Sequence, residues 1–136
     1  MKTKKAFTLI ELLVVISIIG ILVAVGAVSY QRATKLSRDS KRKTDLEQVR
    51  QALETYRSEI GTYPPTASWQ AALTAGYITK IPADPQNNVY AYVVGNTATT
   101  YALCASLEIA PSSPVVPICS GQNCGVGSCN YEVDNP

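Results

Sequence analysis

A single acidic side chain, Glu11, stands at the start of a long apolar stretch of the sequence. Seventeen consecutive uncharged and mostly apolar residues follow it, from Leu12 to Val28. A charged carboxylate inside a membrane-spanning helix costs about 2.5–3.5 kcal/mol near the bilayer centre and less near its edge. Because that cost must be offset, an acid at this position indicates a partner of opposite charge. Glu11 is the first candidate functional residue.

A second set of reactive side chains consists of four cysteines near the C-terminus: Cys104, Cys119, Cys124 and Cys129. In an exported domain of this size they are expected to form two disulfides, for which three pairings exist. We predict Cys104–Cys129, which would join neighbouring strands, and Cys119–Cys124, which would close a loop. Zinc is the alternative, but four residues between successive cysteines is a loose spacing for a zinc knuckle.

The chain contains no histidine, so it lacks the usual general base and the imidazole metal ligand. No cysteine therefore has a histidine to activate it as a nucleophile. Glu132 and Asp134 are candidates for a calcium site, but two acids fall short of the six to eight oxygen ligands that calcium takes. We expect no catalytic residue, no metal ligand and no cofactor, with calcium as the only alternative, and we do not expect an enzyme.

The charged residues divide the 136-residue chain into three unlike parts. Residues 1–30 carry four charges, residues 31–60 carry thirteen and residues 61–136 carry five, so the net charge of +2 averages over different environments. A chain of this length allows one domain. Residues 61–136 are too few to bury a large core of their own, so they must pack against the segment that precedes them.

The apolar segment has three possible identities. Counted from Phe7 to Val28 it would be about 33 Å long as a helix, enough to cross a hydrocarbon core of about 30 Å. It could be a signal peptide cleaved after Ala27, which would release a small secreted binding protein, or an uncleaved anchor. The third identity is a short basic leader followed directly by a membrane helix. Six basic residues follow the segment and three precede it, which by the positive-inside rule favours an N-terminus outside the cytoplasm.

The sequence KKAFTLIELLVVI, at positions 4–16, favours the third identity. It resembles the class III signal of type IV prepilins and of the pseudopilins of type II secretion. The resemblance implies that a prepilin peptidase cleaves between Ala6 and Phe7 on the cytoplasmic side and methylates the new amine of Phe7. The family usually has glycine where this chain has Ala6. The resemblance further implies that Glu11 serves assembly by pairing with the N-terminal amine of an incoming subunit.

The segment after the apolar residues is predicted to continue as a helix. No proline occurs before Pro64. Five apolar residues recur at spacings of three and four, the pattern of a one-sided apolar stripe: Leu46, Val49, Leu53, Tyr56 and Ile60. We predict one helix over Phe7–Ile60, ended by Gly61. Six basic residues and one acid over Arg32–Lys43 are predicted to form a collar that faces solvent or lipid headgroups.

Residues 61–136 are predicted to form a small α+β head. A short helix over Trp69–Ala75 comes first. Three runs rich in β-favouring residues would then form an antiparallel sheet packed on the long helix: Val89–Val94, Thr99–Leu107 and Asn130–Val133, with a hairpin at Gly95-Asn96 between the first two. On the second run the alternation of a strand places Tyr101 and Leu103 on one face and Cys104 on the other.

The head also resembles a known family over part of its length. The segments GTYP at 61–64 and IPADP at 81–85 resemble the head of G-type major pseudopilins and related small pilins. That family typically continues with Trp-Gly and an acidic calcium-binding loop, whereas this chain continues with Gln86-Asn87 and a cysteine-rich loop. The resemblance implies a pilin-like α+β fold, in which a long N-terminal helix, membrane-spanning in its first half, packs on a small antiparallel sheet.

Four parts of the chain follow from these predictions. Residues 1–6 would be a prepilin leader peptide, and residues 7–30 would be a transmembrane and assembly helix. Residues 31–60 would be the amphipathic continuation of that helix, and residues 61–136 would be a globular pilin head with a disulfide-rich C-terminal loop.

The expected function is structural: a subunit of a type IV pilus-like filament, processed by prepilin peptidase and assembled through its N-terminal helix. A major pseudopilin of type II secretion is the first alternative. A DNA-uptake receptor pilin is another, but Lys80 is the only basic residue of the head, so we do not expect nucleic acid as a partner. Expected partners are identical or homologous subunits, the prepilin peptidase, the inner-membrane assembly platform and, before assembly, membrane lipid. The precursor would cross the inner membrane once, and the assembled subunit would lie in an extracellular filament or a periplasmic pseudopilus.

Overall fold

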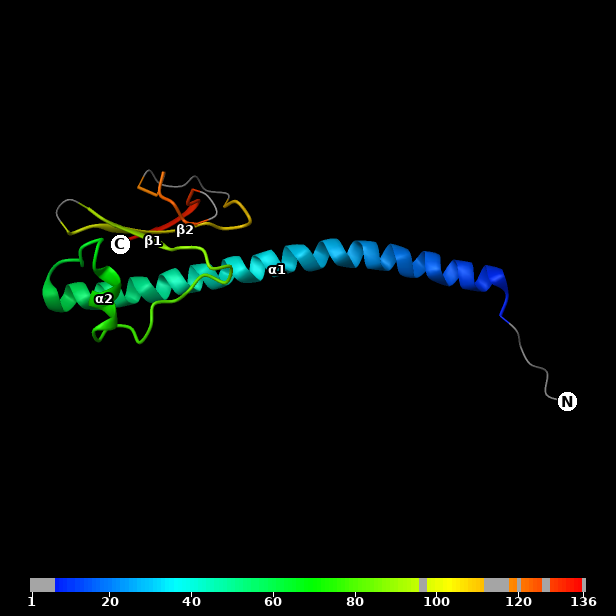
Figure 1. The fold of residues 1–136 in the computed structure, drawn as a ribbon, viewed down its shortest axis with the longest axis horizontal. Helices are drawn as coiled ribbons and strands as arrows, with labels where there is room; N and C mark the ends of the chain where they lie inside the picture. Colours follow the sequence, from blue (N-terminus) through cyan, green and yellow to red (C-terminus); the bar gives the residue numbers. More distant parts are fainter. Residues whose placement is uncertain (1–6, 96–97, 112–117, 120, 126–127, 136) are drawn as a thin grey trace. The chain divides into compact units, whose positions relative to one another are not determined.

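The computed structural model describes all residues except 1–6, 96–97, 112–117, 120, 126–127 and 136. The elements follow in the order α1 (Leu9–Ile60), α2 (Trp69–Thr74), β1 (Ala91–Val94), β2 (Tyr101–Ala105) and β3 (Tyr131–Asp134) (Figure 1). The chain divides into two compact units, residues 1–35 and residues 36–136. This order confirms the predicted α+β, pilin-like fold.

The first unit contains the apolar part of α1. Its large apolar side chains are exposed, from Leu9 at 82% to Val28 at 72%. The most apolar window of α1 has a mean hydropathy of 2.9 and no buried residue. By length and composition α1 is therefore able to cross a membrane.

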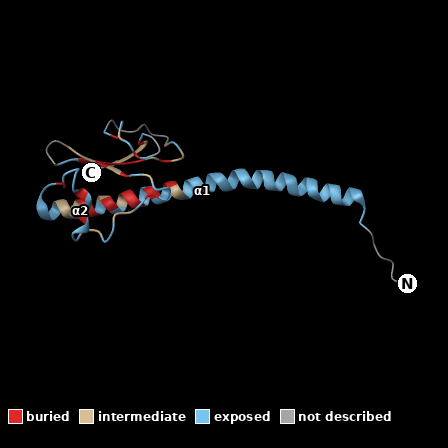
Figure 2. Ribbon diagram, viewed as in Figure 1, coloured by how far each residue is buried: buried red, intermediate tan, exposed pale blue. Residues whose placement is uncertain are grey.

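In the second unit, residues 36–60 of α1 carry the apolar stripe of the head. Leu46, Val49 and Leu53 are fully buried, and Tyr56 packs at the edge of the same cluster (Figure 2). The prediction is wrong for Ile60, which is 56% exposed, because residues 58–60 at the end of α1 are all exposed. Gly61 ends the helix as predicted: its φ is +89°, and its N–H donates to the carbonyl of Arg57 at 2.7 Å.

The three strands form one antiparallel sheet in the order β1-β2-β3. β2 is central, and all five of its residues are buried. Its side chains alternate as predicted: Tyr101 and Leu103 join the core formed with α1, whereas Cys104 lies in a second cluster. β1 and β2 are shorter than the runs predicted for them, and β3 begins and ends one residue later than predicted. The prediction of a hairpin turn at Asn96 lies outside the described residues, but the N–H of Gly95 donates to the carbonyl of Thr100 at 2.8 Å.

The second cluster covers the face of the sheet that points away from the core of α1. Besides the four cysteines it contains Ala102, with Ala91 at its edge. A face lined by small side chains offers little apolar area to bury. The four cysteines therefore make up most of the buried cluster on this side of the head.

Candidate functional site

The first turn of α1 brings Thr8 and Glu11 together in a capping box. Thr8 Oγ1 accepts a hydrogen bond from the Glu11 N–H at 3.3 Å. Glu11 Oε2 accepts hydrogen bonds from the Thr8 N–H at 2.9 Å and from Thr8 Oγ1 at 2.7 Å. This cap explains why α1 begins at Leu9 and not at Phe7. The pairing was not predicted, although Thr-x-x-Glu ahead of an apolar run is its sequence signal.

The carboxylate of Glu11 is only partly used by this cap. Among the described residues, the hydrogen bonds to Glu11 end on Oε2, so Oε1 has no donor. Glu11 lines a surface depression with four apolar side chains: Phe7, Ile10, Val14 and Val15. The structure thus places Phe7 and Glu11 on one apolar surface. Ala6 and the remainder of the predicted leader lie outside the described residues.

In the second unit, a buried arginine connects α1 to two segments of the head. Arg42 is fully buried, and its Nε donates to Asp84 Oδ2 at 2.5 Å. Its Nη1 donates to Asp39 Oδ1 at 2.7 Å and to Glu108 Oε1 at 3.1 Å. Its Nη2 donates to Gln86 Oε1 at 3.0 Å. One guanidinium therefore joins α1 to the loop before β1 and to the segment after β2.

Further contacts extend this network, which we call the Arg42 cluster: Arg38, Asp39, Arg42, Asp84, Gln86 and Glu108. Arg38 Nε and Nη2 each donate to one oxygen of Glu108 at 2.6 Å. Asp39 accepts the backbone N–H groups of Glu108 and Ile109, both at 2.9 Å. The hydrogen bonds from Arg38, and then those from Arg42, hold the pKa of Glu108 at about 2 against the opposing effect of its burial.

Asp84 anchors the loop before β1. Burial raises the pKa of its carboxyl, but the hydrogen bond from Arg42 and those from the N–H groups of Gln86 and Asn88 outweigh burial and hold the pKa below its usual value. All the carboxylates of the Arg42 cluster are paired. The cluster therefore acts as a clamp between elements.

The prediction of a solvated collar over Arg32–Lys43 is wrong for two of its basic residues. Arg38 and Arg42 point toward the head and pair with acids that lie more than forty residues away in the sequence. Helical spacing alone could not identify these partners. The ion pairs within α1 join residues three apart, Asp39 with Arg42 and Glu47 with Arg50.

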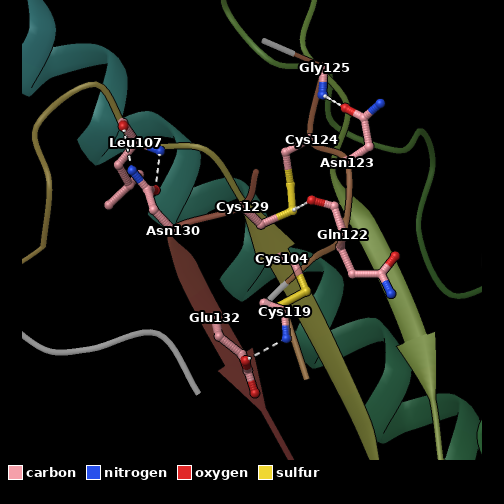
Figure 3. Close-up of a disulfide and its surroundings, with 10 residues drawn as sticks. All are labelled: Cys104, Leu107, Cys119, Gln122, Asn123, Cys124, Gly125, Cys129, Asn130 and Glu132. Atoms are coloured by element: carbon pink, nitrogen blue, oxygen red, sulfur yellow. Dashed lines mark hydrogen bonds between the residues drawn. A yellow bond between two sulfur atoms is a disulfide. The ribbon is translucent and has the colours of Figure 1, made fainter. Parts of the chain in front are cut away.

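The predicted disulfide pairing is also wrong. The structure pairs Cys104 with Cys119 and Cys124 with Cys129 (Figure 3). The predicted Cys104–Cys129 pair would need Cys129 close to Cys104. In the β2–β3 register, however, Glu132 lies opposite Cys104, and Cys129 lies three residues before Glu132 in the chain. Cys129 precedes β3, and its N–H donates to the carbonyl of Gln122 at 3.2 Å, beside Cys124. The prediction that all four cysteines form disulfides is confirmed.

The two acids considered for calcium have other surroundings. Glu132 Oε2 accepts the N–H of Cys119 at 3.1 Å, so Glu132 holds the cysteine loop against β3 (Figure 3). Burial raises the pKa of Glu132, and the N–H of Cys119 opposes that shift. Asp134 is exposed at the end of β3. Within the described part of the chain, no group of three or more acidic or cysteine side chains is arranged to hold a metal ion.

Comparison with known proteins gives relatives from two filament systems. The chain is 28% identical to type II secretion system core protein G of Pseudomonas aeruginosa over 75% of this chain and 82% of that protein. It is 28% identical to the type IV major pilin protein PilA of Myxococcus xanthus over 97% of this chain and 55% of that protein. It is 44% identical to the type IV major fimbrial protein FimA of Dichelobacter nodosus over 38% of this chain and 33% of that protein. No solved structure matches the chain.

Two family models match, and together they cover most of the sequence. Residues 1–27 match the prokaryotic N-terminal methylation motif. Residues 30–106, more than half of the chain, match type II secretion system protein G. The second match contains α2, β1, β2 and every residue of the Arg42 cluster except Glu108, and it ends before the cysteine loop. The chain belongs to the type II secretion system protein G family and begins with the prokaryotic N-terminal methylation motif.

Proposed function

We propose that the mature chain is a structural subunit of a filament, assembled through the apolar part of α1. The observation that carries this proposal is the exposed apolar surface of α1 with one carboxylate near its start. Such a surface is stable in lipid or against the same surface of other subunits. The precursor would cross the inner membrane once, and membrane lipid would cover this surface until assembly.

Glu11 supplies the specificity of assembly in this proposal. Its Oε1 has no donor among the described residues, so it is able to accept a hydrogen bond from an N-terminal ammonium group. Opposite unit charges 4 Å apart attract by about 4 kcal/mol at an effective dielectric constant of about 20. That attraction is similar in size to the cost of keeping an unpaired carboxylate in the membrane, about 2.5–3.5 kcal/mol. The Phe7 amine of an incoming subunit would therefore offset that cost.

The partners follow from this pathway. A prepilin peptidase would cleave between Ala6 and Phe7 and methylate the Phe7 amine, and an inner-membrane platform would bring subunits together. Membership of the protein G family supports a pseudopilus of type II secretion as the product. A type IV pilus is the second candidate, because the similarity to the Myxococcus pilin extends over nearly the whole chain.

Mass spectrometry of the mature N-terminus tests the processing step. The proposal predicts a chain that begins at a methylated Phe7. A chain that begins at Val28 would identify a secreted protein without Glu11, and an intact Met1 in the assembled form would identify an unprocessed anchor. Either of these results would refute the proposed assembly through the Phe7 amine.

A further inference from the structure

The basic side chains of the second unit are nearly all paired. Arg38 and Arg42 bind acids of the Arg42 cluster, and Arg50 binds Glu47. Two others contact tyrosines: Lys43 lies 5.2 Å from the ring centre of Tyr131, and Arg57 donates to Tyr63 Oη. Only Lys41 and Lys80 have no such partner among the described residues of this unit.

These two lysines line the same surface hollow. Lys41 comes from α1 and Lys80 from the segment before β1, and both are exposed. Gln48 and the buried Asp45 complete the polar part of the wall. Asp45 accepts a hydrogen bond from Tyr90 Oη at 2.8 Å, so it is already held by the core. Two ammonium groups and one carboxylate leave the hollow with one net positive charge.

The acidic side chains of the unit show the complementary pattern. Eight of the nine accept hydrogen bonds from side chains or backbone groups: Asp39, Asp45, Glu47, Glu54, Glu59, Asp84, Glu108 and Glu132. Asp134 is the exception within the described residues, and it is exposed at the end of the edge strand β3. Within the described part of the head, Asp134 is thus the acid whose carboxylate is free to bind a positively charged hollow.

The hollow and β3 lie on different flanks of the head. Lys41 lines the hollow, and Lys43 lies over the ring of Tyr131, the first residue of β3. Residues two apart on a helix point about 200° away from each other. β3 therefore lies on the side of α1 opposite the hollow, and no ion pair joins Asp134 to either lysine within the described chain. A contact between them requires two copies.

We propose that the hollow lined by Lys41 and Lys80 binds the carboxylate of Asp134 from a second copy of this chain. The inference rests on the proposed function, because it assigns a contact between heads to the proposed filament. An interface between two different flanks is heterologous, and when its rotation does not close a ring it generates an open helical array. Each copy would use its hollow toward one neighbour and its β3 toward the other.

Charge reversal tests the contact in cells that express the assembly machinery. The variants are Lys80→Glu, Asp134→Lys and the double variant, with Gln51→Glu, on the exposed face of α1, as a control that adds a negative charge away from both the hollow and β3. Filaments are sheared from the envelope and quantified by immunoblot, and the amount of membrane-bound subunit is measured to detect degraded variants. Each single reversal is expected to lower the filament yield at least about tenfold, because like charges then meet at the contact.

The double variant is the decisive comparison, because it restores opposite charges with their positions exchanged. We expect it to return the yield to within about threefold of the wild type, and we expect the Gln51→Glu control to stay within the same range. Normal filaments from both single variants, or a double variant no better than the singles at equal subunit level, would overturn the contact alone. A wild-type chain that forms no filament would overturn the proposed function together with the contact.

Discussion

Replacing Arg42 by methionine should destabilise the head more than any other single change of charge. Methionine fills a similar volume, but Asp84 and Asp39, whose side chains are 1% and 5% exposed, would lose the one cationic partner that each has among the described residues. Glu108 would keep Arg38. Removing one partner of a buried ionic pair costs about 3–5 kcal/mol, because the remaining charge is buried without compensation.

Trp69 is suited to measure this loss in the full chain in detergent. It is the only tryptophan, it is 7% exposed, and its ring lies 5.3 Å from that of Tyr92, so its fluorescence reports unfolding of the head. A loss of 3–5 kcal/mol should lower the Tm by about 12 °C or more for a unit of this size. The matched control is Arg50→Met, which removes an ion pair whose side chains are 34% and 44% exposed and should cost no more than about 1 kcal/mol.

The sign of the pH dependence gives a second readout of the same substitution. In the wild type the pKa of Asp84 is lowered in the folded state. Its carboxylate therefore stabilises the head at a pH above the ordinary pKa of an aspartic acid, and this stabilisation is lost as the pH falls through the lowered pKa. Without Arg42, burial would raise the pKa of Asp84, so protonation would favour the folded state and the variant should gain stability as the pH falls toward 5. A loss of stability in Arg42→Met no larger than that in Arg50→Met would contradict the role of Arg42 as a buried ionic partner. Parallel losses of stability by the wild type and Arg42→Met on acidification would contradict it too.

Three further predictions use the same fluorescence assay. The wild-type head should lose stability between about pH 4.5 and pH 2, because the pKa of Glu108 is lowered to about 2 and its protonation removes the bonds to Arg38; a flat profile there would contradict this. Ala98→Gly should stabilise the head by about 0.5–1 kcal/mol, because Ala98 has a φ of +54°, and a loss of stability would contradict this. Replacing Cys124 and Cys129 together by serine should cost about 2 kcal/mol of stability, and replacing Cys104 and Cys119 together should cost about 3 kcal/mol. The second loss is larger because the loop-closure entropy grows with the separation of the two cysteines, which is 5 residues for Cys124–Cys129 and 15 for Cys104–Cys119; equal losses would contradict this order.

The long helix and the core of the head were predictable because each depends on a local repeat. The spacing of Leu46, Val49 and Leu53 defines one face of a helix wherever that helix packs. The alternation along Tyr101–Ala105 likewise defines the two faces of β2 without knowledge of its neighbours. The prediction for Ile60 was wrong because a stripe shows which face is apolar and does not show how far the head extends along it.

The Arg42 cluster and the disulfide pairing depend on distant segments, so no local repeat encodes them. Arg42 and Asp84 are 42 residues apart in the sequence. A run of basic residues has the same local sequence whether its side chains face solvent or pair with a buried acid. The pairing of Cys104 depends on the β2–β3 register, which places Glu132 opposite it and leaves Cys119 to approach from the loop. The cap between Thr8 and Glu11 was predictable from the local sequence Thr-x-x-Glu. It was missed because Glu11 was considered only for the cost of burying its charge.

The proposal that Glu11 acts through its charge has a direct test, because two substitutions separate the charge from the cap. Glu11→Gln removes the charge but keeps a side chain that completes a capping box, whereas Thr8→Val removes the cap and keeps the charge. The measurement is the amount of sheared filament, by immunoblot and electron microscopy, at equal levels of membrane-bound subunit. If the charge of Glu11 drives assembly, Glu11→Gln abolishes filaments while Thr8→Val retains them. Wild-type filament levels in Glu11→Gln would contradict it.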